Sequence, residues 1–189
     1  MFHHLPDLLV GDSAGANLAL LAAAAAVNNY LLDRLVHSTG INLHSWAFPK
    51  INRVVSIYGM LDQDAWHAGS GCYQRTLACL YRASLPLEVL CPTIGTTPFH
   101  VSFAWLLREE PKQMLSLPPI LLCCGDKDFL LSSSKGVASR RNAMGYSATL
   151  RIYPGHHAFL GLPPGWTFHR CFENSIPCAN DVLMQILQS

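Results

Sequence analysis

The feature that most constrains the fold is an apolar run near the start of the chain that breaks into a Gly-x-Ser-x-Gly motif. Residues Leu8 to Val10 are followed directly by Gly11 to Gly15 (GDSAG), and an alanine-rich helical segment comes next. Glycines on either side of a serine allow the backbone to fold tightly between a strand and a helix. In that context the hydroxyl of Ser13 stands clear of the sheet, in the arrangement called a nucleophile elbow.

The length and composition are typical of one α/β domain. The chain has 189 residues, enough to bury a sizeable core without disulfides or metal ions. Hydrophobic residues make up 50% and charged residues 13%, against roughly 25% charged in an average domain. Parallel strands buried on both faces have this character, because their sequences are continuous apolar runs. We therefore expect residues 1–189 to form a single domain.

Charge and hydropathy argue against two classes of partner. The net charge is +1 and the lysines and arginines are scattered, so no basic stripe indicates a nucleic-acid partner. The longest apolar segment, Leu18 to Val27, has about half the length that a bilayer span requires. We predict no nucleic-acid partner and no transmembrane segment, and we read this segment as a buried helix.

The cysteines give no sign of a disulfide framework or a metal site. Their number is odd and no C-x-x-C pair is present, so we expect no metal ion. Cys123 and Cys124 fall in an apolar run, where free thiols behave as small hydrophobic side chains. Reduced thiols slightly favour a cytoplasmic location. The seven cysteines are Cys72, Cys79, Cys91, Cys123, Cys124, Cys171 and Cys178.

Strand and helix patterns alternate along the chain, which predicts a parallel sheet with right-handed crossovers and flanking helices. The predicted strands are residues 5–10, 53–58, 120–124 and 148–153, and the predicted helices after the first, third and fourth strands are 14–28, 133–144 and 174–187. We expect the last of these helices to bury one apolar stripe, formed by Ile176, Val182, Leu183, Ile186 and Leu187. The segment from about 61 to 118 is less regular, with possible helices at 73–83 and 99–109. We expect this segment to be a cap-like insertion over the sheet.

Three side chains that can carry chemistry follow successive predicted strands. Ser13 follows the first strand, Asp128 the third and His157 the fourth. The carboxyl ends of parallel strands meet at one edge of a sheet, so we expect these residues to lie together there. The chain order Ser, Asp, His is the order used by α/β-hydrolases among the serine-hydrolase folds.

These residue types suit nucleophilic catalysis. A serine hydroxyl needs an imidazole to take its proton, and a carboxylate to fix the tautomer of that imidazole. The backbone N–H of Ala14, at the start of the helix, is placed to stabilise an oxyanion. The second oxyanion donor is expected from an upstream His-Gly-Gly-Gly-like loop, which this sequence does not contain.

Each assignment has a competitor in the sequence. Asp126 is an alternative acid, although a turn residue that bonds its own backbone is the better interpretation of it. His156 competes with His157 as the base, and only one of two neighbours in a loop can reach Ser13. Asn17 is interpreted as a structural support near the start of the helix.

The motifs resemble those of a known hydrolase family. Residues Gly11 to Ala19 (GDSAGANLA) are similar to the elbow of the hormone-sensitive-lipase-like branch of the α/β-hydrolases, which includes bacterial esterases and arylacetamide-deacetylase-like enzymes. Residues Asp128 to Leu130 resemble the family's Asp-x-Leu motif, and His157 to Phe159 its His-Gly-Phe motif with Ala in place of Gly. The resemblance implies a partial α/β-hydrolase fold whose leading strands are missing, as in an N-terminally truncated chain.

The resemblance also implies an activity. It implies a serine hydrolase that cleaves a small-molecule carboxylic ester through an acyl-enzyme, with Ser13 as nucleophile, His157 as base, Asp128 as orienting acid and no cofactor. It leaves open the preference between esters and amides, and the oligomeric state. The alternative is a truncated or degenerate homologue with little or no activity, which acts at most as a binding scaffold.

Overall fold

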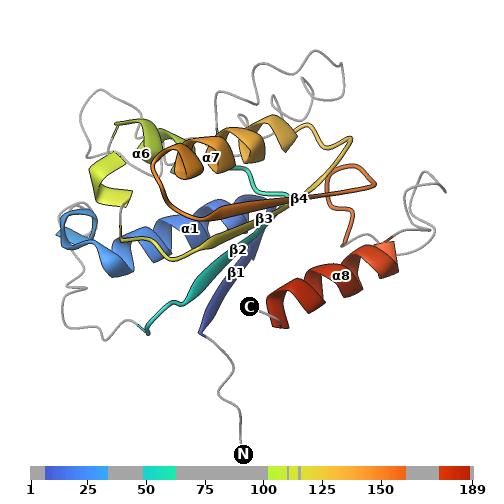
Figure 1. The fold of residues 1–189 in the computed structure, drawn as a ribbon, viewed down its shortest axis with the longest axis horizontal. Helices are drawn as coiled ribbons and strands as arrows, with labels where there is room; N and C mark the ends of the chain where they lie inside the picture. The colour runs from blue at the N-terminus through green and yellow to red at the C-terminus, as the bar shows by residue number, and fades with distance from the viewer. Residues whose placement is uncertain are drawn as a thin grey trace, which may run out of the picture.

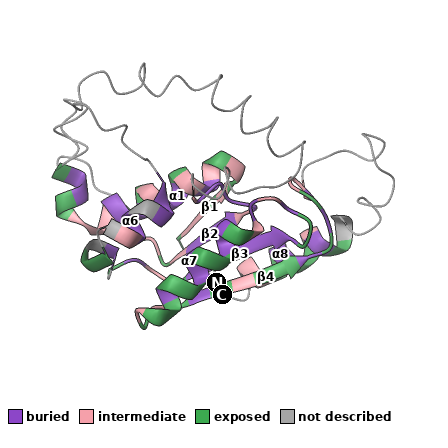
Figure 2. Cartoon of the chain, turned by 90° about the horizontal axis from the view of Figure 1, so that it is seen from above, coloured by how far each residue is buried: buried purple, intermediate pink, exposed green. Residues whose placement is uncertain are grey.

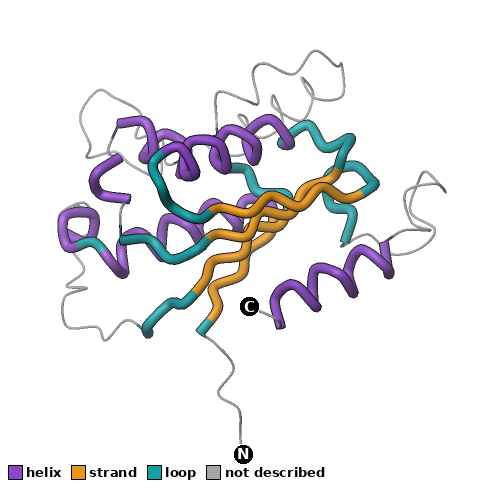
Figure 3. The backbone as a smooth tube through the Cα atoms, viewed as in Figure 1, coloured by secondary structure: helices purple, strands orange, loops and turns teal. Residues whose placement is uncertain are grey.

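The chain folds around a parallel sheet, seen in a computed structural model that describes residues 7–33, 49–62, 102–109, 111–114, 116–160 and 175–187. The strands are β1 (Leu8–Asp12), β2 (Arg53–Ile57), β3 (Ile120–Gly125) and β4 (Ala148–Tyr153), hydrogen-bonded in the order β1-β2-β3-β4 (Figures 1 and 3). The helices are α1 (Ser13–Val27), α6 (Phe103–Glu109), the 3-10 helix η2 (Pro111–Met114), α7 (Leu131–Ala143) and α8 (Ser175–Leu187). The predicted parallel sheet with flanking helices is confirmed.

The elements lie close to their predicted positions. Strand β4 has the predicted bounds, and α1 begins at Ser13, one residue earlier than predicted. The short helix η2 was not predicted from the sequence. Within the predicted insertion of residues 61–118, residues 63–101 lie outside the described residues, together with the predicted helix at 73–83. The insertion therefore stays a prediction.

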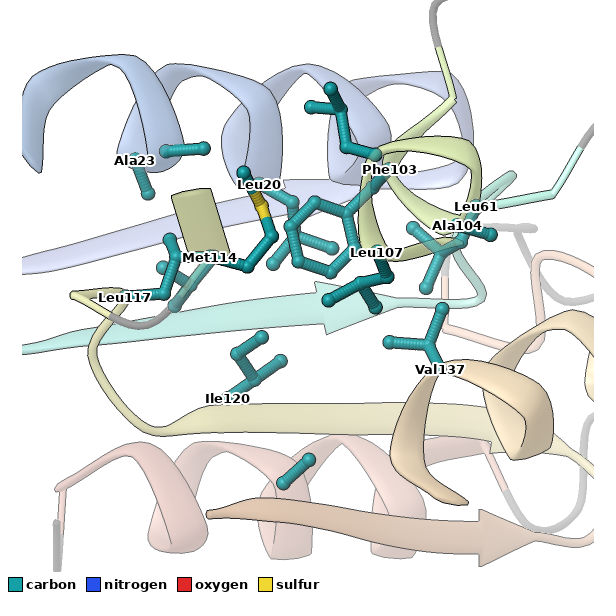
Figure 4. Close-up of a cluster of buried hydrophobic side chains, with 14 of the residues drawn as sticks. Leu20, Ala23, Leu61, Phe103, Ala104, Leu107, Met114, Leu117, Ile120 and Val137 are labelled. Atoms are coloured by element: carbon teal, nitrogen blue, oxygen red, sulfur yellow. The ribbon is translucent and has the colours of Figure 1, made fainter. Parts of the chain in front are cut away.

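Helices cover both faces of the sheet, with α1, α6 and α7 on one side and α8 on the other (Figure 1). Because successive side chains of a strand point to opposite faces, neighbouring residues join different cores. Val54 belongs to the cluster under α1, α6 and α7, whereas Val55 belongs to the cluster under α8. Both are fully buried, and the central strands are the most buried part of the sheet (Figure 2). Figure 4 shows the first cluster, in which the ring of Phe103 lies beside Leu20 of α1 and over β2.

Helix α8 buries one stripe of side chains, but a different one from that predicted. Cys178, Val182 and Ile186 pack on the sheet at a spacing of four residues. The expectation that Leu183 joins this stripe was wrong, because its side chain is 52% exposed. Adjacent residues of a helix point about 100° apart, so Val182 and Leu183 cannot both face the sheet.

Helix α1 lies directly on the sheet. Its small side chains bring it close to β1 and β2, and Ala16, Leu20 and Ala23 are fully buried. Leu18, on its outer side, is 63% exposed, so the helix is not buried all round as the apolar sequence suggested. Among the helices of the described residues, none is long and apolar enough to cross a membrane.

Strand β3 holds two adjacent cysteines in the interior, as predicted. Cys123 and Cys124 are free thiols with 0% exposure. Burial raises the pKa of each thiol from 9.0 to about 12, because a thiolate loses its hydration in the core. Cys178, on α8, is also free and buried, and the other four cysteines of the sequence lie outside the described residues.

These two thiols predict alkaline destabilisation. Above pH 9 the unfolded chain releases the thiol protons that the folded chain keeps until about pH 12. The free energy of unfolding should therefore fall as the pH rises through this range, by about 1 kcal/mol per pH unit for each thiol. Urea unfolding at pH 8 to 10.5 tests this, with Cys123→Ala and Cys124→Ala expected to flatten the fall. Equal slopes in the variants and the unaltered protein would contradict it.

Candidate active site

Strand β1 and helix α1 meet so closely that one glycine between them is obligatory. A Cβ added at Gly11 would lie 2.3 Å from the carbonyl oxygen of Gly15, which leaves no room for a side chain. A Cβ at Gly15 would be 3.6 Å from Asp12 Oδ1, an ordinary contact. The two glycines of the motif therefore differ, since Gly11 is required by space and Gly15 is not. Between them Ser13 has φ 48°, in the left-handed region that most residues avoid.

The turn after β3 fixes the carboxylate of Asp128. This side chain has 0% exposure, and its Oδ1 accepts a hydrogen bond of 2.8 Å from the backbone N–H of Leu130. The backbone N–H of Asp128 in turn donates to the carbonyl of Gly125 at 3.2 Å. A buried carboxylate needs such partners, and these bonds hold its free acceptor sites toward the loop after β4.

His157 joins the nucleophile to the carboxylate. Its Nε2 lies 3.1 Å from Ser13 Oγ, and its Nδ1 lies 3.1 Å and 3.3 Å from the two oxygens of Asp128. An ionised carboxylate only accepts hydrogen bonds, so Nδ1 carries the proton and Nε2 is left to accept from the hydroxyl of Ser13. The imidazole is 22% exposed, which leaves it partly open to solvent. This arrangement can move a proton from the serine to the histidine.

The neighbouring residues that competed for these positions lie elsewhere. His156 is exposed, while His157 is the histidine in contact with Ser13. Asp126 does not bond its own backbone as expected. Its Oδ1 accepts a 2.8 Å hydrogen bond from the N–H of Gly155, in the loop that carries His157. Asp126 therefore ties the acid loop to the histidine loop.

The two loops also touch through their backbones. The N–H of Lys127 donates to the carbonyl of Gly155 at 2.9 Å. A Cβ added at Gly125 would lie 2.4 Å from that same carbonyl oxygen, so the loops approach too closely for a side chain there. The position of His157 is thus set by contacts with the loop that carries Asp128.

Two aromatic rings that the sequence analysis did not single out contact the imidazole. Tyr58, directly after β2, has its ring centroid 5.2 Å from that of His157, and Phe129 lies at 5.0 Å. The hydroxyl of Tyr58 donates to Asp12 Oδ2 at 3.5 Å. Burial, with Asp12 nearby, raises the pKa of Tyr58 to about 12, so the phenol stays neutral. Tyr58 is the last residue of the strand predicted at 53–58 and lies directly after β2, so its place at the carboxyl end of a strand was its sequence signal.

Other predicted contributors have structural positions. Asn17 Oδ1 accepts a 2.9 Å hydrogen bond from the N–H of Phe103, so it supports the start of α6. The ring of Phe103 is fully buried in the core. Within the described part of the chain, no group of three or more His, Cys, Asp or Glu side chains is placed to hold a metal ion.

Comparisons with known proteins point to one family. A family model described as alpha/beta hydrolase fold matches residues 6–161. No curated protein matches the chain.

Solved structures share the fold. Esterase B from Lactobacillus rhamnosis has a TM-score of 0.65 and 21% identity, over 95% of this chain and 51% of that one. An esterase from the bacterial hormone-sensitive lipase family has a TM-score of 0.55 and 18% identity, over 96% and 51%. The Pyrobaculum calidifontis esterase has a TM-score of 0.55 and 18% identity, over 95% and 51%. The chain therefore spans about half the length of each.

The unequal roles of the two motif glycines predict unequal effects. Gly11→Ala should prevent or strongly destabilise folding, because its Cβ would overlap the backbone at Gly15. Gly15→Ala should shift the melting temperature by only a few degrees and add helix propensity inside α1. Thermal unfolding followed by circular dichroism compares the two. Equal destabilisation by both substitutions would show that the spacing described above is wrong.

The hydrogen bond from Gly155 to Asp126 predicts a local effect. Asp126→Ala should speed hydrogen exchange of the Gly155 amide by about fivefold, the equivalent of about 1 kcal/mol for a lost hydrogen bond. Asp126→Asn keeps an acceptor oxygen and should preserve most of the protection. NMR-detected exchange measures both variants. Unchanged protection in Asp126→Ala would exclude this tie between the loops.

Proposed function

This chain belongs to the alpha/beta hydrolase fold family, and on that premise we propose that it is a serine hydrolase acting on carboxylic esters. The described strands and helices form a partial α/β-hydrolase fold. We further propose that residues 1–189 form a single domain of this fold. Oxyanion stabilisation by the backbone N–H of Ala14 belongs to the same proposal.

The observation that carries the proposal is the hydrogen-bonded series from Ser13 through His157 to Asp128. The distances of 3.1 Å on each side of the imidazole lie within hydrogen-bond reach. The residues come from loops after three different strands, so chance adjacency in sequence does not explain their contact. A serine hydroxyl within reach of an imidazole, and a carboxylate that orients that imidazole, are the features that acyl transfer by a serine nucleophile uses.

The mechanism follows from these positions. His157 Nε2 takes the hydroxyl proton as Ser13 Oγ attacks the ester carbonyl, and Asp128 stabilises the imidazolium. The tetrahedral oxyanion lies at the start of α1, where the N–H of Ala14 and the helix dipole favour negative charge. Collapse of the intermediate releases the alcohol, which takes its proton from His157, and leaves an acyl-enzyme. Water activated by the same histidine then hydrolyses the acyl-enzyme.

The substrate class rests on the similar structures. Those named above are described as esterases, which supports an ester as the substrate. The same residues also suit amide cleavage, so a comparison of matched ester and amide substrates belongs in the test.

Active-site labelling tests the proposal. A fluorophosphonate probe should label the protein, and Ser13→Ala should abolish the labelling because the probe bonds to an activated serine. Ser13→Ala and His157→Gln should each lower hydrolysis of p-nitrophenyl esters by about 10⁶-fold, which is down to the background rate. Asp128→Asn should lower it less, by about 10⁴-fold, because the imidazole then adopts the wrong tautomer.

The matched control is Ser132→Ala, at an exposed serine of α7. This variant should keep full labelling and full ester hydrolysis. Full labelling of Ser13→Ala would contradict the proposal. A folded protein that takes up no probe and hydrolyses no ester would favour the binding-scaffold alternative.

A further inference from the structure

The side chain of Tyr58 contacts both the nucleophile elbow and the loop that carries His157. The ring of Tyr58 meets the imidazole of His157 edge-on, with centroids 5.2 Å apart and planes at 68°. Its hydroxyl donates to Asp12, the residue directly before the nucleophile, at 3.5 Å. The same ring meets Phe159, two residues after the histidine, at 5.6 Å. Tyr58 therefore lies between the elbow and the histidine loop.

The backbone around Tyr58 is held at both ends. Its own N–H donates to the carbonyl of Cys123 at 2.6 Å, and the N–H of Met60 donates to the carbonyl of Ser13 at 3.0 Å. Between them, a Cβ at Gly59 would lie 2.4 Å from Ser56 Oγ, so this segment fits tightly against β2. Tyr58 has φ 39°, a strained conformation that persists only where the surrounding structure enforces it. The backbone that carries the ring is thus fixed by the fold and not by the contact with the histidine.

The imidazole needs such support. The His157 ring can rotate about its side-chain bonds, and the side chain is 22% exposed. Its two polar contacts lie at opposite ends of the ring, and the bond to Asp128 is divided between two oxygens at 3.1 and 3.3 Å. Tyr58 and Phe129 supply the apolar contacts on the ring itself. Of these two, Tyr58 also reaches the nucleophile's strand.

We propose that Tyr58 is a positioning residue, whose ring keeps the imidazole of His157 aligned between Ser13 and Asp128. The expected effect of Tyr58 on the rate of ester hydrolysis rests on the proposed hydrolase function. Its expected effect on the position of the imidazole rests on the contacts alone. The ring does the positioning, and the hydroxyl contributes by fixing the ring to Asp12.

Kinetics give the first test. Tyr58→Leu should lower kcat for a p-nitrophenyl ester by about 10- to 100-fold, the effect expected from a misplaced catalytic group. KM should change less than about twofold, because Tyr58 acts on the histidine and not on the bound ester. Tyr58→Phe keeps the ring and should restore kcat to within about threefold of the unaltered protein.

Tyr153→Leu is the matched control. Tyr153 is also a buried tyrosine in contact with Phe159, with centroids 5.4 Å apart, and its hydroxyl bonds Asp181 rather than a residue of the site. This variant loosens the same aromatic cluster without removing a ring from His157. Its kcat should stay within about threefold. A loss equal to that of Tyr58→Leu would overturn the proposal.

NMR gives a test that needs no turnover. The hydrogen-bonded Nδ1 proton of His157, identified by its absence in His157→Gln, should be visible in the unaltered protein, in Tyr58→Phe and in Tyr153→Leu. It should vanish by exchange with water in Tyr58→Leu, or in Tyr58→Met if the leucine variant does not fold. Retention of this signal in the folded Leu or Met variant overturns the proposal. If the unaltered protein shows the signal but no esterase activity, and Tyr58→Leu loses the signal, the positioning role is supported and the proposed function is refuted.

Discussion

No side chain fits between the end of β1 and the start of α1, and the rest of the site depends on this contact. A Cβ at Gly11 would lie 2.3 Å from the carbonyl oxygen of Gly15, so strand and helix meet backbone to backbone. The turn that joins them places Ser13 at φ 48°. Its hydroxyl then lies at the carboxyl edge of the sheet, where the loops after β3 and β4 bring Asp128 and His157. A wider turn would move the hydroxyl away from the imidazole.

Backbone strain collects around this edge. Among the described residues, the non-glycine positions with positive φ are Ser13, Tyr58 and Ala158, and all three belong to the site or contact it. Each such conformation costs about 1–3 kcal/mol and persists only where packing enforces it. The clusters on the two faces of the sheet supply that packing, and Figure 4 shows the one under α1, α6 and α7. Ala158 occupies a position where the resemblance implies glycine, and its φ of 62° explains that preference.

Local sequence patterns predicted the elements better than their orientations. Continuous apolar runs predicted the buried strands, because a strand covered on both faces needs apolar residues at every position, and β3 is buried throughout. The stripe of α8 was predicted less well, because several apolar residues compete for one face and only the partner surface selects Val182 over Leu183. Arg141 is a buried cation on α7 that donates to the carbonyls of Met114, Leu117 and Pro118. The burial of Arg141 could not be predicted from the sequence, because its hydrogen-bond partners are backbone atoms distant in sequence.

The sequence by itself determined the order of the reactive groups and their places after successive strands. Those properties follow from local patterns, namely apolar runs, glycines and the residues just beyond them. The tertiary structure decided which neighbour in each loop joins the hydrogen-bonded series that starts at Ser13. Asp128 and His157 make the hydrogen bonds, while Asp126 binds the backbone of Gly155 and His156 faces solvent. Adjacent side chains in a loop point in different directions, and the contacts between distant loops fix which direction leads to the site. The same contacts brought Tyr58 to the imidazole, a pairing between residues 58 and 157 that no local pattern encodes.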